Sequence, residues 1–150
     1  MNSKKSVENF LASKTIAVVG VSRNKQKFGS NVYRALKKKG YTLYPVNPYM
    51  QVFEGDKCYP DISSIPEKPE AALLSIPPDK TEAVLEEIFN IGITKVWMQQ
   101  GSQSDKAIKF CEVHNIECIS NECILMFAQP TEFFHRAHKF FRGIFRKLPQ

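Results

Sequence analysis

Short apolar runs alternate with segments of helical periodicity along most of the chain. The first run, residues 15–19, is rich in β-branched residues and stops at Gly20, which is typical of a strand buried on both faces. Later runs of strand length also stop at Gly, Pro, Ser or Asn. The five predicted strands cover residues 15–19, 41–46, 71–76, 95–98 and 116–119.

Three segments between these strands carry apolar residues at the spacing of one helix face. We expect one helix over about 29–39, ending at Gly40 after three lysines that suit the last turn of a helix. A second helix should begin with Asp79 as its N-cap and Glu82 three residues later, and end at Gly92. A third covers 104–114. The residues predicted to face inward are Val32, Ala35, Leu36, Val84, Leu85, Ile88, Phe89, Ala107, Ile108 and Cys111.

This order of elements predicts a Rossmann-like, doubly wound α/β fold with a parallel sheet of about five strands. Residues 52–59 form a small excursion around a turn that contains Gly55. No apolar run approaches ~20 residues, so no transmembrane helix is expected. The first ten residues lack the apolar run of a secretory signal, and we expect a cytoplasmic protein.

Four cysteines should therefore stay reduced, as small buried or half-buried thiols. They are Cys58, Cys111, Cys118 and Cys123. With His114, the last three could be imagined as zinc ligands, but their spacing matches no common zinc module. No metal site is predicted.

Positive charge is concentrated at the C-terminal end. The formal net charge is +6, and residues 131–150 contain five basic residues against one acid. Apolar residues recur there at helical spacing opposite the basic ones, which predicts an amphipathic C-terminal helix after a domain over 1–130. Three kinds of partner fit such a helix: protein, an anionic membrane surface, or nucleic acid. The protein partner could be the domain itself or a second copy of the chain. We favour protein, and hence a homo-oligomer, since amphipathic helices usually bury their apolar stripe in protein.

The loop after the first strand carries the clearest chemistry. Gly20 permits a sharp turn, Ser22 offers a hydroxyl, and Gly29 opens a helix whose free N–H groups suit an anion. Three cationic residues, Arg23, Lys25 and Lys27, lie in the same loop. Ligands in doubly wound sheets bind at the carboxyl ends of strands, so this loop is predicted to hold a phosphate.

The loop is not the dinucleotide fingerprint. Its pattern is G-x-S-x₆-G in place of G-x-G-x-x-G, and the second strand ends in Val46, Asn47 and Pro48 without the acid that holds a ribose diol. Both departures argue against NAD.

Several strand ends together resemble one family. The pattern VVGVS…G, PVNP, SIPP, VWMQQG and the Asn-Glu-Cys after the fifth strand is similar to small CoA-binding domains. More distantly, it resembles the N-terminal domain of the succinyl-CoA synthetase α subunit. The resemblance runs over about residues 14–127 and implies coenzyme A as the ligand. The residues it implies for binding, with the loop residues above, are Gly20, Val21, Ser22, Arg23, Lys25, Lys27, Phe28, Gly29, Asn47, Pro48, Ile76, Pro77, Gln100, Gly101 and Asn121.

No catalytic residue is predicted, because no paired acid and base occur at the strand ends. We therefore expect a non-catalytic CoA or acyl-CoA binding protein that acts as a sensor, carrier or regulator. The alternatives are an acyl-CoA ligase component and an NAD(P)-binding oxidoreductase. Two details stay open: whether Cys123 exchanges thiols, and whether Tyr44 or Tyr49 stacks on the adenine.

Overall fold

The computed structural model describes residues 3–24 and 27–127 of the chain. Its centre is a five-stranded parallel sheet with the strand order β2-β1-β5-β6-β7. The strands are β1 (Thr15–Val19), β2 (Thr42–Val46), β5 (Ala71–Leu74), β6 (Lys95–Gln99) and β7 (Glu117–Glu122). All five predicted strands are confirmed, with ends that move by up to three residues.

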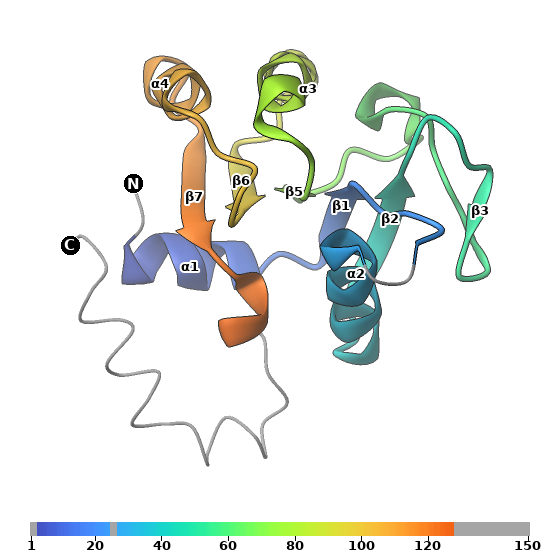
Figure 1. The fold of residues 1–150 in the computed structure, drawn as a ribbon. Coiled ribbons are helices and arrows are strands. Elements are labelled where there is room, and N and C mark those ends of the chain that lie inside the picture. The colour runs from blue at the N-terminus through green and yellow to red at the C-terminus, as the bar shows by residue number, and fades with distance from the viewer. Residues whose placement is uncertain (1–2, 25–26, 128–150) are drawn as a thin grey trace.

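Helices cover both faces of the sheet, as the predicted fold requires (Figure 1). Residues of α1 (Lys4–Leu11) and α2 (Phe28–Lys38) pack on one face, and residues of α3 (Pro78–Ile91) and α4 (Asp105–Val113) pack on the other. Alternate residues along β1 enter the two cores: Ile16 and Val18 face α2, while Ala17 and Val19 face α3. The apolar strands are thus buried on both sides.

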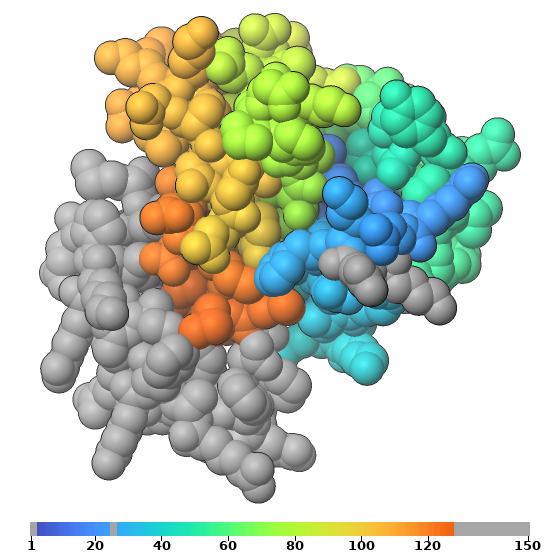
Figure 2. Space-filling model, viewed as in Figure 1, coloured from blue at the N-terminus to red at the C-terminus, as the bar shows by residue number. Residues whose placement is uncertain are grey.

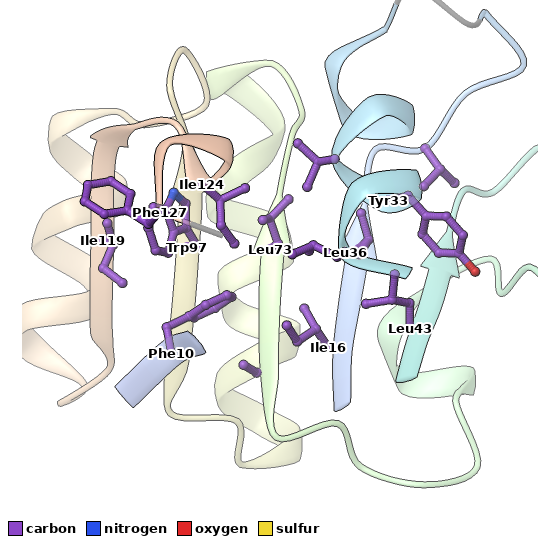
Figure 3. Packing of buried hydrophobic residues seen from close by; sticks show 14 of the residues in the cluster. Phe10, Ile16, Tyr33, Leu36, Leu43, Leu73, Trp97, Ile119, Ile124 and Phe127 are labelled. Atoms are coloured by element: carbon purple, nitrogen blue, oxygen red, sulfur yellow. The ribbon is translucent and has the colours of Figure 1, made fainter. Parts of the chain in front are cut away.

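Helix α1 was not predicted from the sequence. Ser3 caps it by accepting a hydrogen bond from the N–H of Ser6 at 3.0 Å. Two of its own side chains, Val7 and Phe10, are buried. The Phe10 ring meets Trp97 edge-on at a centroid distance of 5.3 Å (Figure 3). A Ser cap followed by apolar residues at helical spacing was the available signal.

Two predictions about α3 are wrong. The N-cap lies two residues earlier than expected, at Pro77, so the helix begins at Pro78; Asp79 lies inside the first turn and forms no cap. Proline is well suited to the first helical position, where its missing N–H costs nothing. Phe89 does not enter the core but is 45% exposed, and its ring meets those of Phe110 and His114 on α4.

The excursion between β2 and β5 forms a small antiparallel hairpin. Its strands are β3 (Val52–Phe53) and β4 (Asp56–Lys57), and the short 3₁₀ helix η1 (Ile62–Ser64) follows. A second 3₁₀ helix, η2 (Ile124–Met126), comes after β7. None of the helices in the described part of the chain has the length and apolar character needed to cross a membrane. The predicted C-terminal helix at 131–150 lies outside the described residues.

Candidate functional site

A cavity of about 440 Å³ opens at the carboxyl ends of β1, β2 and β5. The chain runs from β1 outward to β2 and then returns to the other side of β1 to form β5, so strand order reverses here. Such a switch point is where open α/β sheets bind ligands. The cavity is lined by Val19, Gly20, Val21, Ser22, Lys27, Val46, Asn47, Pro48, Tyr49, Pro60, Asp61, Ile62, Ser75, Ile76, Pro77, Lys80, Ala83, Val84 and Glu87.

Two glycines let the backbone close up around the base of the cavity. Gly20 has a φ of +112°, and a Cβ there would lie 2.0 Å from the carbonyl oxygen of Ser75. A Cβ on Gly29 would lie 2.5 Å from the carbonyl oxygen of Gly20. Helix α2 therefore begins directly against the end of β1, so its first N–H groups are held near the cavity.

The first loop is held by side chains rather than by secondary structure. The buried hydroxyl of Ser30 accepts a hydrogen bond from the N–H of Ser22 at 2.9 Å and donates one to its carbonyl at 2.8 Å. The Ser22 hydroxyl in turn accepts from the N–H of Asn24 at 3.1 Å. The loop is thus preorganised by Ser30, a residue that the sequence analysis did not single out.

Asn47 joins three parts of the site. Its side-chain amide donates to the carbonyl of Val21 at 2.7 Å, and its side-chain oxygen accepts from the N–H of Tyr49 at 2.7 Å. Its backbone N–H donates to the carbonyl of Tyr59 at 2.9 Å. Asn47 therefore positions the first loop and the segment after β2 against each other.

The far wall of the cavity comes from segments that sequence analysis did not assign to the site. Pro60, Asp61 and Ile62 supply one part, and α3 supplies the rest. The Glu87 carboxylate accepts from the N–H of Ile62 at 2.9 Å, which joins the two parts. On the face shown in Figure 2, the blue atoms of the first loop lie next to the green atoms of α3.

The sequence contains a signal for the helix face that the cavity-lining α3 residues share, although not for its place at the cavity. The α3 residues that line the cavity are Lys80, Ala83, Val84 and Glu87. They recur at intervals of three and four, which is the spacing of one helix face. Because α3 starts at the strand end, one face of its first three turns lines the cavity.

The hairpin next to this wall is clamped to α2 by polar contacts. The Tyr33 hydroxyl donates to the Asp56 carboxylate, and Lys37 Nζ lies 2.6 Å from the same carboxylate. Burial and this hydrogen bond raise the pKa of Tyr33 above its ordinary value. Partial burial alone would raise the pKa of Asp56, but the hydrogen bonds from Lys37 and Tyr33 outweigh it and lower that pKa.

The cavity suits an anion at one end. Lys27 and Lys80 line it, and α2 begins at its rim with no acid in the first turn. Both the helix start and the lysines favour negative charge there. Two acids, Asp61 and Glu87, also line the cavity, but Asp61 caps η1 by accepting from the N–H of Ser64 at 2.9 Å.

The structure brings about half of the predicted binding residues together. Those that line the cavity are Gly20, Val21, Ser22, Lys27, Asn47, Pro48, Ile76 and Pro77. Gly29 lies buried behind Gly20, whereas Arg23 on the loop and Phe28 at the start of α2 are exposed and do not line the cavity. Lys25 lies outside the described residues.

The remaining predicted residues form a separate polar group at the ends of β6 and β7. The side chain of Gln103 joins Gly101 and Asn121. Its Oε1 accepts a hydrogen bond from the N–H of Gly101 at 2.9 Å, and its Nε2 lies 3.4 Å from the side-chain oxygen of Asn121. Gln100 is exposed beside them. This group does not line the cavity, but Ser102 Oγ accepts from the N–H of Ile76 at 3.0 Å and so connects the two.

The cysteines are free thiols, of which Cys58, Cys111 and Cys118 are buried. Cys123 is half-buried, and its sulfur lies 3.1 Å from the amide nitrogen of the buried Gln99. In the part of the chain that the structure covers, no three His, Cys, Asp or Glu side chains gather as metal ligands.

Comparison with known proteins finds relatives of the chain whose names refer to coenzyme A. The chain is 33% identical over 101 residues to the ADP-forming acetate–CoA ligase II of Archaeoglobus fulgidus. That match covers 66% of this chain but only 15% of the ligase. The uncharacterized protein YneT of Bacillus subtilis is 27% identical over 123 residues, which are 81% of this chain and 91% of YneT.

A solved structure shares the whole architecture. A conserved hypothetical protein from Pyrococcus furiosus superposes with a TM-score of 0.72 and 32% identity, over 75% of this chain and 97% of that one. The family comparison matches residues 14–129, which include every strand of the sheet and the complete cavity. The chain therefore belongs to the CoA binding domain family.

Proposed function

We propose that this protein binds coenzyme A or an acyl-CoA in the cavity at the switch point, as a non-catalytic sensor, carrier or regulator. One observation carries the proposal: the cavity joins the start of α2, the Gly20 loop and two lysines in a family defined by CoA binding. The diphosphate lies against the Gly20 loop, where helix N–H groups and the Lys27 ammonium stabilise its charge.

The end of β2 supports coenzyme A over NAD. It carries Asn47, whose side chain is already hydrogen-bonded to Val21 and Tyr49, in place of an acid that would bind a ribose diol. The adenosine ribose of coenzyme A bears a 3′-phosphate, which an acid at this position would repel. Lys80 is a cation on the opposite wall that favours such a phosphate.

The remaining predicted residues extend the proposed site beyond the cavity. Gln100, Gly101 and Asn121 lie at the ends of β6 and β7, past Ile76 and Pro77. Coenzyme A is longer than a nucleotide, and its pantetheine arm would run along this edge of the sheet. Arg23, Phe28 and Lys25 belong to the same first loop and would contact the phosphates from outside.

The hydrogen bonds that the polar groups of the cavity already make support the proposed non-catalytic role. Glu87 and Asp61 each accept a backbone N–H, and the Asn47 side chain bridges two loops. Groups committed in this way position backbone and are poorly placed to transfer protons. The bound thioester would then be carried or sensed without being changed.

A second candidate function is a component of an acyl-CoA ligase. The observation that favours it is the similarity to acetate–CoA ligases, of which this chain covers between 15% and 28%. A ligase needs further domains, so affinity purification of the tagged chain from its own cells should then recover a second subunit at equal amount. Recovery of the chain alone would contradict this second function.

Isothermal titration calorimetry with CoA, acetyl-CoA, NAD and ATP tests the main proposal. We expect binding heat with CoA and acetyl-CoA, and much weaker binding of NAD. Replacing Lys27 by Met should weaken the binding of CoA. Replacing Lys109 by Met should leave that binding unchanged, because Lys109 lies on α4, away from the cavity. Binding of NAD with no heat from CoA would refute the proposal.

A further inference from the structure

Tyr49 is an exposed aromatic side chain at the cavity. It is 84% exposed, yet it lines the cavity. The other large apolar side chains exposed in the described residues, Phe28, Val52, Phe89 and Val113, do not line it. A single exposed aromatic residue needs no explanation by itself. The position of Tyr49 at the mouth of the cavity, however, requires an explanation.

The backbone that carries this ring is rigidly connected to the phosphate loop. The N–H of Tyr49 donates to the side chain of Asn47 at 2.7 Å, and that side chain donates to the carbonyl of Val21 at 2.7 Å. Two hydrogen bonds therefore relate the position of the ring to the loop proposed to hold the diphosphate. Preorganisation of this kind reduces the entropy that binding must overcome.

Tyr44, the other tyrosine beside the Asn47-Pro48 turn, is used elsewhere. Its ring meets Tyr59 at a centroid distance of 6.2 Å, and its hydroxyl lies 3.5 Å from the Glu67 carboxylate. It does not line the cavity. The choice that the sequence left open between the two tyrosines is thus narrowed by geometry to Tyr49.

We infer that Tyr49 is the stacking platform for the adenine of the bound nucleotide and selects ligands that carry a base. This inference rests on the proposed function. In this fold the nucleoside lies beyond the end of the second strand, and Tyr49 follows the last residue of β2 by three positions. With the diphosphate on the Gly20 loop, the base reaches the cavity mouth, where Val84 of α3 also lines the cavity with apolar surface. Aromatic side chains hold bases by face-to-face contact.

Three ligands separate the base from the rest of coenzyme A. They are CoA itself, adenosine 3′,5′-bisphosphate, which has the base but no pantetheine arm, and 4′-phosphopantetheine, which has no base. By calorimetry, Tyr49→Ala should bind the first two about 10- to 100-fold more weakly, the range expected for loss of one stacked base. Its affinity for 4′-phosphopantetheine should match that of the wild type. Tyr49→Phe keeps the ring and should keep wild-type affinity for all three.

Phe89→Ala is the matched control, since Phe89 is also an exposed aromatic side chain but lies on the outer side of α3. It should bind CoA as the wild type does. A thermal melt of Tyr49→Ala should match the wild type, because so exposed a ring contributes little to folding.

Fluorescence gives a second, independent measurement. The chain has one tryptophan, Trp97, which is fully buried and contacts the Phe10 ring (Figure 3). A Tyr49→Trp substitution adds an indole at the cavity mouth, and the bisphosphate should quench its emission while 4′-phosphopantetheine should not.

Two results would overturn the inference and leave CoA binding intact. One is a Tyr49→Ala variant that binds CoA as tightly as the wild type. The other is an equal loss of affinity for CoA and for 4′-phosphopantetheine, which would show a general effect on the loop. A wild-type protein that binds neither CoA nor the bisphosphate would instead overturn the proposed function itself, and the stacking role with it.

Discussion

At the scale of single residues, the site depends on two positions where only glycine fits. Gly20 combines a left-handed φ with an approach of its missing Cβ to 2.0 Å from a carbonyl oxygen, and Gly29 allows helix α2 to touch Gly20. The sequence indicated a sharp turn at Gly20 and a helix start at Gly29. That the two glycines contact each other depends on tertiary packing, because the intervening loop could have opened in many directions.

Replacing Gly20 by Ala should lower the free energy of unfolding by about 3–5 kcal/mol, since the new methyl group would collide with the backbone of Ser75. Gly40→Ala is a matched control, because Gly40 also has a positive φ, +97°, but open space around it. Its cost should be limited to about 1–2 kcal/mol of backbone strain. Urea denaturation of both variants measures the difference, and equal losses would rule out the steric explanation.

Ser30 should matter in the same loop through its hydrogen bonds. Ser30→Ala leaves both backbone polar groups of Ser22 without their partner, which should cost about 1–3 kcal/mol of stability and loosen the phosphate loop. Calorimetry should show that Ser30→Ala binds CoA more weakly than the wild type. Ser30→Thr, which retains a hydroxyl, should lose less of that affinity. Unchanged affinity in Ser30→Ala would mean that the loop is held by other contacts.

At the scale of elements, the hairpin that precedes the Pro60–Ile62 wall in the chain packs against α2. Tyr33 and Lys37 on α2 both contact Asp56 on β4, and the Tyr33 ring meets Phe53 on β3 edge-on at 5.0 Å. The strands of the hairpin are only two residues long. Such short strands have little stability alone, so these side-chain contacts hold the hairpin in place.

This clamp predicts an acid-sensitive contribution to stability. The pKa of Asp56 is lower in the folded protein than its ordinary value of 3.8, so its contribution is present above that value and is lost as the pH falls through the lower folded pKa. Asp56→Asn should reduce stability at pH 7 by about 1 kcal/mol or less, because the ion pair is partly exposed.

The pH dependence is measured by urea denaturation of both proteins at pH 7, 4 and 3. The difference between wild type and Asp56→Asn should shrink as the pH falls below 3.8, since protonation of the wild-type carboxyl removes its charge. A difference that stays constant over this range would show that charge at Asp56 does not stabilise the hairpin.

The elements themselves were largely predictable, and the errors have physical causes. The five strands stood out because each is a short apolar run. The N-cap of α3 was misassigned since Pro77 and Pro78 looked like a strand end, although proline also starts helices well. Phe89 has the right period for the core but faces α4 near the surface. Helix α1 was missed because eight residues with few apolar positions make a weak pattern.

At the scale of the whole molecule, the cavity exists because the strand order reverses at β1. The first loop, the β2 end and the wall from Pro60 to Ile62 are far apart in sequence but meet at one end of the sheet. All the residues that line the cavity lie between Val19 and Glu87. We propose that the C-terminal segment serves assembly and not ligand binding.

Deleting residues 131–150 should therefore leave the affinity for CoA unchanged, as measured by calorimetry. We also expect the full chain to form a homo-oligomer through this basic amphipathic segment, and the shortened chain to sediment as a monomer. A large loss of CoA affinity in the shortened chain would mean that the segment completes the site. An oligomeric state that survives the deletion would remove its role in assembly.

The sequence by itself determined the class of fold, the first loop and the strand ends that carry polar residues. These features are local: strand length, helical period and glycine positions can be interpreted within a few residues. Only the tertiary structure decided which strand ends share one cavity, that α3 and the segment after the hairpin form its far wall, and that Tyr49 rather than Tyr44 faces it. Those facts depend on strand order and on contacts between distant segments, which no local pattern encodes.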